Sequence, residues 1–190
     1  MIPSDGELML RVRRDDLAAF DELVQRYQGS LIQFFYRHGS DRALAEDCTQ
    51  EVLLKLYKSR ATFLPGGSFR SFVFTIANNL WIDVVRTRRA QPAMLSTDFT
   101  AAMGASEGIA TGETATPARN AEMLELGEKI GRAIAALPDE QRAVWVLAEE
   151  CGLRYSEVAS ILRVPVGTVK SRMHFATLKL REALKSELKS

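Results

Sequence analysis

Apolar residues recur every three or four positions along most of the chain, which is the spacing of amphipathic helices. In the first half the pattern predicts three helices, at about residues 15–35, 41–57 and 69–88. Asp15 or Asp16 is the expected N-cap of the first helix, with a break near Gly29, and Asp41 is the N-cap of the second. A Pro-Gly-Gly-Ser run at residues 65–68 separates the second helix from the third, because proline and glycine break helices.

The second half has the same spacing. It predicts helices at about residues 123–136 and 139–150, a short one from Ser156 to a stop at Pro165, and a last one from Gly167 or Thr168 nearly to Ser190. The pattern contains no convincing strand and no internal repeat. The sequence therefore predicts an all-α fold.

Residues 91–120 lack a sustained apolar period and are rich in Ala, Thr, Ser and Gly. Such a segment cannot bury enough surface to offset the entropy lost on ordering, and a structureless loop of this length within one compact domain is unusual. We therefore expect two small helical domains, at residues 7–90 and 121–188, joined by a flexible acidic linker at residues 91–120.

The composition is that of a soluble globular chain, with 46% hydrophobic and 26% charged residues. No apolar run approaches the ~20 residues that a membrane span requires. The first residues lack the basic start and apolar stretch of a secretory signal. These features predict a cytoplasmic protein that does not insert into a membrane.

The two cysteines, Cys48 and Cys151, lie far apart, and neither belongs to a CxxC pair. A zinc or redox motif is therefore not supported. We expect both to be buried thiols that act as small apolar groups.

The net charge of +1 conceals an uneven distribution. Residues 90–118 carry three acidic and no basic side chains, whereas residues 163–185 carry six basic side chains and one acidic, Glu182. A local basic excess of this kind is typical of a surface that binds nucleic-acid phosphates.

Candidate catalytic residues are lacking. The two histidines, His38 and His174, have no neighbouring pattern for nucleophilic or metal chemistry, and the chain has no GxGxxG, P-loop, HExxH or GxSxG motif. We therefore expect a protein that is not an enzyme and needs no cofactor or metal.

Residues 155–175 have the spacing of a helix-turn-helix, with Ser156 as the N-cap of the first helix and a turn at residues 163–166. Five apolar side chains are expected to form the seam between the helices: Val158, Ala159, Leu162, Val164 and Val169. The second helix presents side chains that can hydrogen-bond, pair with phosphate or contact thymine methyls: Thr168, Lys170, Ser171, Arg172, His174 and Phe175. A solvated amphipathic helix pair is the competing interpretation.

The helix expected from Phe69 interleaves aromatic and amide side chains with basic ones. The members of this set are Phe72, Phe74, Asn78, Asn79, Trp81, Arg86, Arg88 and Arg89. The combination suits melted DNA, whose bases can stack and be read on their edges. Because aromatic stripes are more often core, we expect Phe72 and Ile76 in the core. Asn78 and Asn79 are costly to bury unpaired and are the better contact candidates.

Three segments resemble the sigma-70 family of transcription initiation factors, in that family's order. Residues 45–57 (AEDCTQEVLLKLY) resemble its core-polymerase-binding helix, and residues 69–83 resemble the segment that melts and reads the minus-ten element. The runs LPDEQR, YSEVA and VGTVKSR, which begin at residues 137, 155 and 166, resemble the minus-thirty-five reader. The short two-domain layout is similar to the extracytoplasmic-function group.

The resemblance implies a factor that binds core RNA polymerase and promoter DNA, directs promoter-specific initiation and is controlled by an anti-sigma factor. The residues implied in polymerase binding are Asp47, Gln50, Glu51 and Leu54. Those implied at the minus-ten element are Pro65, Gly66, Gly67 and Ser68, around a flipped base, and Asn78, Asn79, Arg86, Arg88 and Arg89, along the strand. Those implied at the minus-thirty-five element are Arg154 and Thr168, on phosphates, and Lys170, Ser171, Arg172, His174 and Phe175, in the major groove.

Two positions depart from the family pattern. Cys48 stands where an aliphatic residue is common, and Arg163 replaces a common glycine in the turn of the helix-turn-helix. The geometry of that turn is therefore open.

Two other functions fit parts of the sequence. A conventional helix-turn-helix regulator would bind operator DNA, typically as a dimer, but it leaves residues 46–57 and the Asn78-Asn79 pair unexplained. An enzyme with an appended DNA-binding module would need a catalytic constellation that the sequence does not provide.

Overall fold

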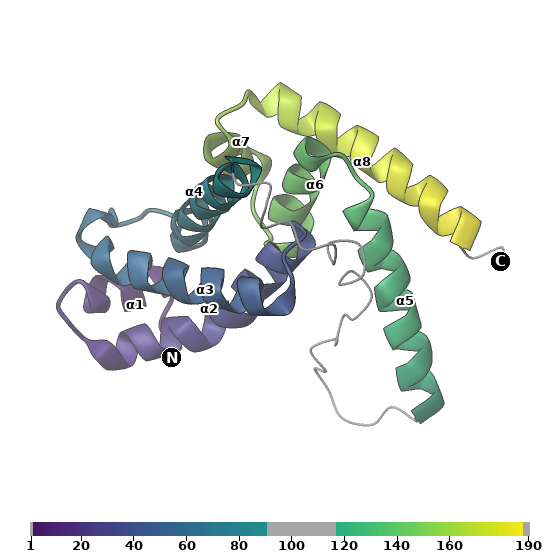
Figure 1. Cartoon of the computed structure of the whole chain (residues 1–190). Coiled ribbons are helices and arrows are strands. Elements are labelled where there is room, and N and C mark those ends of the chain that lie inside the picture. The colour runs from purple at the N-terminus through teal and green to yellow at the C-terminus, as the bar shows by residue number, and fades with distance from the viewer. Residues whose placement is uncertain (1, 91–116, 188–190) are drawn as a thin grey trace.

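The computed structural model describes residues 2–90 and 117–187, without the side chains of Arg89 and of residues 117–124, 186 and 187. Within these ranges the secondary structure is helical and includes no strand, which confirms the predicted all-α class. Helices α1 to α4 form an N-terminal domain and helices α5 to α8 a C-terminal domain, and the two lie against each other (Figure 1). Most of the predicted linker, residues 91–116, lies outside the described residues, and α5 begins within its last positions, at Pro117.

The N-terminal domain consists of α1 (Asp5–Val12), α2 (Leu17–Arg37), α3 (Arg42–Lys58), the 3₁₀ turn η1 (Arg60–Thr62) and α4 (Phe69–Ala90). The predicted caps are present: Asp16 accepts a hydrogen bond from the Ala19 amide at 3.1 Å, and Asp41 accepts one from the Leu44 amide at 2.8 Å. The expected break at Gly29 is absent, because α2 is continuous from Leu17 to Arg37.

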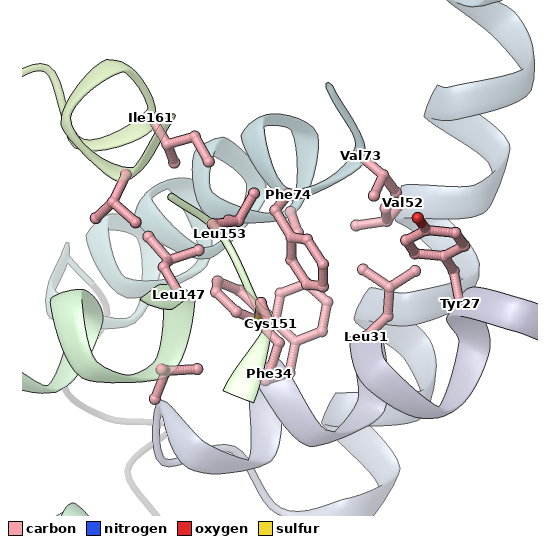
Figure 2. Packing of buried hydrophobic residues seen from close by; sticks show 14 of the residues in the cluster. Tyr27, Leu31, Phe34, Val52, Val73, Phe74, Leu147, Cys151, Leu153 and Ile161 are labelled. Carbon is pink, nitrogen blue, oxygen red and sulfur yellow. The ribbon is translucent and has the colours of Figure 1, made fainter. Parts of the chain in front are cut away.

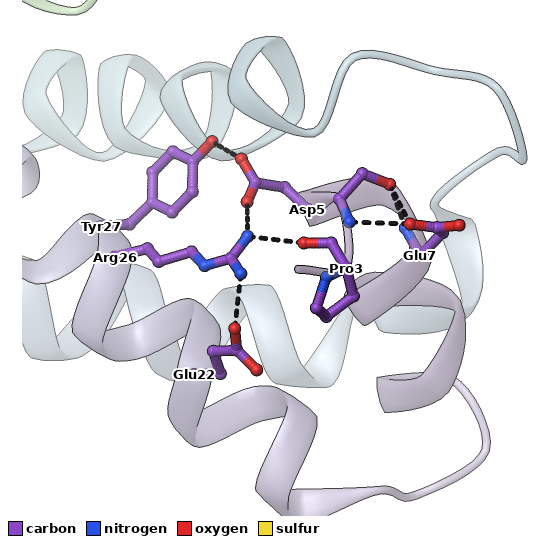
Figure 3. A network of polar contacts seen from close by, with 7 residues as sticks. Pro3, Asp5, Glu7, Glu22, Arg26 and Tyr27 are labelled. Atoms are coloured by element: carbon purple, nitrogen blue, oxygen red, sulfur yellow. Dashed lines mark hydrogen bonds and ion pairs between the residues drawn. The ribbon is translucent and has the colours of Figure 1, made fainter. Parts of the chain in front are cut away.

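Helix α1 was not predicted from the apolar pattern, because two turns are too short to establish a period. The sequence nevertheless contains a capping box at the start of this helix, formed by Ser4 and Glu7. The Ser4 hydroxyl accepts from the Glu7 amide at 3.3 Å, and the Glu7 carboxylate accepts from the Ser4 amide at 2.7 Å (Figure 3).

A polar network fastens α1 to α2 (Figure 3). Arg26 donates to Asp5 at 2.6 Å and to Glu22 at 2.5 Å, and the Tyr27 hydroxyl donates to the other Asp5 oxygen at 2.5 Å. Burial and the adjacent Asp5 carboxylate raise the pKa of Tyr27 to about 12. Tyr27 therefore remains a neutral hydrogen-bond donor at physiological pH.

The C-terminal domain consists of α5 (Pro117–Ala135), α6 (Asp139–Trp145), the π-helical turn η5 (Val146–Glu150), α7 (Tyr155–Leu162) and α8 (Val166–Glu187). The helix expected at residues 139–150 therefore has a π-helical end. The N-cap of α7 is Arg154 and not Ser156, and the Arg154 amide donates to the Glu157 carboxylate at 2.9 Å. This bond, from the N-cap amide to the carboxylate of the third helical residue, is the reciprocal half of a capping box and differs from the bond that a serine N-cap would accept.

One apolar cluster runs through both domains. Phe34 and Phe74 of the N-terminal domain lie beside Leu147 and Leu153 of the C-terminal domain (Figure 2), and all four are at most 4% exposed. The two domains therefore share a core, which the sequence did not predict.

The expectations for individual core positions were partly correct. Phe72 and Ile76 are half-buried and pack against the cluster, while Phe74 is fully buried and cannot stack on a base. Cys48 and Cys151 are both buried, as predicted. Burial raises the pKa of both thiols, that of Cys48 to about 11.

Among the described residues, no helix combines the length and the apolar character needed to cross a membrane.

Candidate functional site

The turn between α7 and α8 depends on one residue in the left-handed region. Arg163 has φ 55° and ψ 44°, and its amide donates to the Ala159 carbonyl. This backbone conformation costs a residue with a Cβ about 1 kcal/mol, whereas glycine adopts it freely. The chain thus makes the helix-turn-helix turn with a strained arginine, and α8 begins where the Thr168 amide bonds to the Pro165 carbonyl at 2.9 Å.

The predicted seam between α7 and α8 is confirmed. Val158, Ala159 and Val169 are buried, and Leu162 and Val164 are half-buried against them. This packing fixes the angle at which α8 leaves α7 and so decides which side of α8 faces solvent.

The outer side of α8 carries four exposed side chains from the predicted set: Lys170, Ser171, His174 and Phe175. The Phe175 side chain is 54% exposed, and its ring contacts the His174 ring edge-on at 5.6 Å between centroids. Arg154 is exposed at the start of α7, and Thr168 is half-buried at the start of α8. The surface combines a cation, a hydroxyl and an apolar ring, which are the groups that read base edges in a major groove.

Arg172 differs from its neighbours on α8. Its guanidinium forms an ion pair with Glu140 of α6 at 2.6 Å, and its side chain is 22% exposed. In this structure Arg172 ties α8 to α6, and the sequence pattern contained no signal for that contact.

The outer side of α4 carries the second predicted set. Asn79, Arg86 and Arg88 are exposed, and Arg86 pairs with Asp83 at 3.0 Å. Asn78, by contrast, is only 4% exposed. The side chain of Arg89 lies outside the described residues.

The loop before α4 is exposed and compact. Gly66 has φ 80°, which glycine adopts without strain, and the Gly67 amide donates to the Leu64 carbonyl at 3.0 Å. The Ser68 hydroxyl accepts from the Ser71 amide at 3.1 Å and begins α4. Pro65, Gly66, Gly67 and Ser68 therefore form a turn fixed at the start of the helix that carries Asn79.

Helix α7 lies beside α4 (Figure 1), and two cavities have linings that include residues of both helices. A cavity of about 340 Å³ is lined by Asn78, Asn79, Ile82 and Asp83 of α4 and by Ile161, Leu162 and Arg163 of the other domain. A cavity of about 460 Å³ lies between the Gly67–Ser68 loop and the first turns of α7, including Ser156, Glu157 and Ser160. The surface expected to read single-stranded DNA thus faces the helix-turn-helix.

The predicted polymerase-binding residues lie together on α3. Asp47, Gln50, Glu51 and Leu54 are all exposed and recur at the spacing of one helical face. Leu54 keeps 54% of its side chain in solvent although α3 has a buried side, and Glu51 pairs with Lys55 at 3.0 Å. The exposed face of α3 thus combines two carboxylates and an amide with a leucine at its C-terminal end.

A buried histidine was not foreseen. His38 ends α2, and its Nδ1 lies 2.7 Å from the Phe34 carbonyl, while its ring packs on Phe34 and Trp81. Burial, with a smaller contribution from the Arg142 charge on α6, lowers the pKa of His38 to about 4. Among the described residues no group of three or more His, Cys, Asp or Glu side chains is arranged to hold a metal.

Comparison with known families matches both domains. The family described as sigma-70 region 2 matches residues 23–91, and the family described as sigma-70, region 4 matches residues 127–180. The match over residues 23–91 accounts for the segments that a conventional helix-turn-helix regulator leaves unexplained.

Individual relatives are sigma factors as well. The chain is 34% identical to the ECF RNA polymerase sigma factor RpoE of Cereibacter sphaeroides over 184 residues, 94% of each protein. It is 31% identical to the ECF RNA polymerase sigma factor SigE of Mycolicibacterium smegmatis over 88% of its own length and 62% of that protein's. The solved RpoE of Bartonella quintana, in complex with the anti-sigma factor NepR, has a similar fold, with a TM-score of 0.64, 24% identity, and 87% and 96% of the two chains covered.

Proposed function

Because this chain belongs to the extracytoplasmic-function group of the sigma-70 family, it is a transcription initiation factor and not an enzyme, and we propose which of its surfaces bind polymerase and promoter. The observation that carries the proposal is that three separate exposed faces, on α3, α4 and α8, coincide with the segments matched to the family. The faces differ in chemistry, as contacts to protein, single strand and duplex require.

The face of α3 binds core RNA polymerase. Asp47, Gln50, Glu51 and Leu54 stand exposed on a helix whose other side is fixed in the core, so their positions are set before binding. A preformed surface loses little entropy on association.

The loop at residues 65–68 and the outer side of α4 read the minus-ten element. The loop forms a pocket for a flipped base, Asn78 and Asn79 contact the released strand, and Arg86, Arg88 and Arg89 hold its phosphates. Extruding bases costs a few kcal/mol, which binding to the captured strand must offset.

The outer side of α8 reads the minus-thirty-five element. Lys170, Ser171, His174 and Phe175 enter the major groove, joined by Arg172 once Glu140 releases it, while Arg154 and Thr168 contact phosphates. Exposed His174 and Phe175 are the side chains that set base preference, because an imidazole and an apolar ring contact only certain base edges in the major groove, whereas Lys170 can also bind phosphate at any sequence.

An anti-sigma factor controls the protein by covering these surfaces, and the protein acts in the cytoplasm, where polymerase and promoters are. Support for the partner comes from the Bartonella quintana RpoE of similar fold, which was solved in complex with an anti-sigma factor.

Core binding is tested with Asp47→Ala plus Gln50→Ala. Because both side chains are exposed, we expect an intact fold, loss of co-purification with core polymerase and loss of run-off transcription. Asp21→Ala plus Gln25→Ala, which changes an exposed Asp and Gln of α2, is the matched control. Unchanged co-purification of the α3 variant would remove this face from the proposal.

A further inference from the structure

The minus-ten-reading side of α4 already has an occupant, the chain's own helix α7. Ile161 and Leu162 line the same cavity as Asn78 and Asn79, and Asn78 keeps only 4% of its side chain in solvent. The α3 face and the outer side of α8 remain exposed in the same structure. Of the three proposed surfaces, only the one for strand capture is partly covered: Asn78 is buried, while Asn79, Arg86 and Arg88 remain exposed.

This arrangement cannot read both promoter elements. Elements centred at minus ten and minus thirty-five are separated by about 25 base pairs, or about 85 Å of B-form DNA at about 3.4 Å per base pair. Helix α8 starts at Val166, four residues after the last residue of α7. Four residues reach at most about 14 Å, so α8 stays close to α4 for as long as α7 does.

Two polar contacts join the domains beside α7. The Arg37 Nε lies 2.9 Å from a Glu150 oxygen, with the two side chains 12% and 21% exposed, and the Arg70 guanidinium donates to the Cys151 carbonyl at 3.0 Å. Arg37 also lies against α5, where a Cβ at Gly131 would be 2.9 Å from its Nη1. The absence of a side chain at Gly131 leaves room for the guanidinium.

The same junction also contains buried polar groups that oppose the docking of the two domains. The His38 Nε2 and the Gln141 Oε1 are buried without a hydrogen-bond partner in the described part of the chain. Each such atom costs about 1–3 kcal/mol. Burial also raises the pKa of Glu150 in spite of the adjacent Arg37. The apolar contacts in Figure 2 favour docking, and these groups reduce the stability that those contacts give the junction.

From these observations, and resting on the proposed function, we propose that α7 is a self-inhibitory cover for the minus-ten-reading surface of α4. The Arg37–Glu150 ion pair and the Arg70–Cys151 contact hold the cover closed. Polymerase docks on α3 while the cover is closed, and the domains separate before the strand is captured.

The two native cysteines report on the cover without any added label. Cys151 lies at the junction, beside Phe34 (Figure 2), whereas Cys48 is buried in α3 within the N-terminal domain. Separation of the domains exposes Cys151 and leaves Cys48 buried. The rate at which dithiodipyridine modifies each cysteine in the full chain, relative to the unfolded chain, therefore measures opening.

The decisive variant is Glu150→Arg, which places a cation against Arg37. We expect Cys151 to react about tenfold faster, as when a part-buried ion pair is replaced by a repulsion, with Cys48 unchanged. Arg37→Glu in the same chain restores the opposite charges and slows the reaction again. Glu125→Arg, which reverses a carboxylate paired with Lys129 inside α5, is the matched control.

Function is measured as the rate of promoter opening with core polymerase, followed by 2-aminopurine fluorescence at the minus-ten element. We expect Glu150→Arg to open promoters faster than the native chain, and the charge-swapped double variant to return to the native rate. The proposed cover would be overturned if Cys151 in the native chain reacted as fast as in the unfolded chain. It would also be overturned if Glu150→Arg made Cys151 react faster without opening promoters faster. Absence of initiation by every variant, with the thiol results as expected, would instead overturn the proposed function.

Discussion

At the residue scale, several side chains have structural roles that could not be predicted from their residue type. Arg163 holds a left-handed turn position, Arg172 pairs with Glu140, and His38 is buried where α2 ends. Arg163 and His38 lie at helix ends, whereas Arg172 lies inside α8. The pairing of Arg172 and the burial of His38 arise from neighbours that are distant in sequence, Glu140 and Trp81, and therefore only the folded chain shows them.

His38 makes stability depend on pH. Its pKa falls to about 4 in the folded chain from an ordinary value of 6.5, so the unfolded chain binds the proton more tightly. Stability is complete above pH 6.5 and is lost as the pH falls toward 4, by about 3 kcal/mol in total. Urea unfolding at pH 7.5 and pH 5 measures the loss.

His38→Phe keeps a ring against Phe34 and removes the titrating group. We expect this variant to lose most of the difference in unfolding free energy between the two pH values. His174→Phe, which changes an exposed histidine, is the control. An equal pH dependence in the native chain and His38→Phe would show that buried His38 is not the acid-sensitive group.

At the element scale, each helix has one side committed to the core and one side left for contacts. The buried side of α8 is formed by Val169, Met173, Ala176 and Leu180, which recur every three or four residues. That periodicity is visible in the sequence, so the exposed face of α3 could be predicted residue by residue. The exposed face of α8 could be predicted except for half-buried Thr168 and for Arg172, which pairs with Glu140. The face of α4 was predicted less well, because α7 covers part of it.

The charge on α8 yields a prediction for duplex binding. Lys170 is exposed, so Lys170→Ala should weaken binding of the full chain to minus-thirty-five duplex and reduce the slope of log affinity against log salt by about one. Glu140→Gln releases Arg172 from its ion pair and should strengthen binding.

Fluorescence anisotropy with labelled duplex at several salt concentrations distinguishes these effects. Lys58→Ala, an exposed lysine at the end of α3, is the control. A salt slope that Lys170→Ala leaves unchanged would contradict the placement of α8 in the groove.

At the scale of the whole molecule, the shared core is the main feature. The apolar cluster extends without interruption from α1 to α8, and Arg37 and Arg70 cross from one domain to the other. Two matched family regions are thus two domains in sequence and one packed body in this structure. The domain boundaries at residues 7–90 and 121–188 remain a prediction.

The shared core predicts cooperative unfolding. We expect a single transition when the native chain is heated in a calorimeter, because loss of either domain exposes apolar surface of the other. Glu150→Arg should separate the trace into two transitions, whereas Glu125→Arg should not. Two transitions in the native chain would show that the contact between domains contributes little stability.

The sequence by itself determined the helices from α2 onward, the caps at Asp16 and Asp41, and most of the sides that the helices bury. These follow from spacings of three or four residues and from side chains close to the backbone groups they satisfy. Its three motifs also determined the family. Only the tertiary structure decided how the domains meet, that Asn78 is covered, that His38 is buried and that Arg172 is paired. Those outcomes depend on contacts between residues up to about a hundred positions apart, such as Arg37 and Glu150, and no local pattern encodes them.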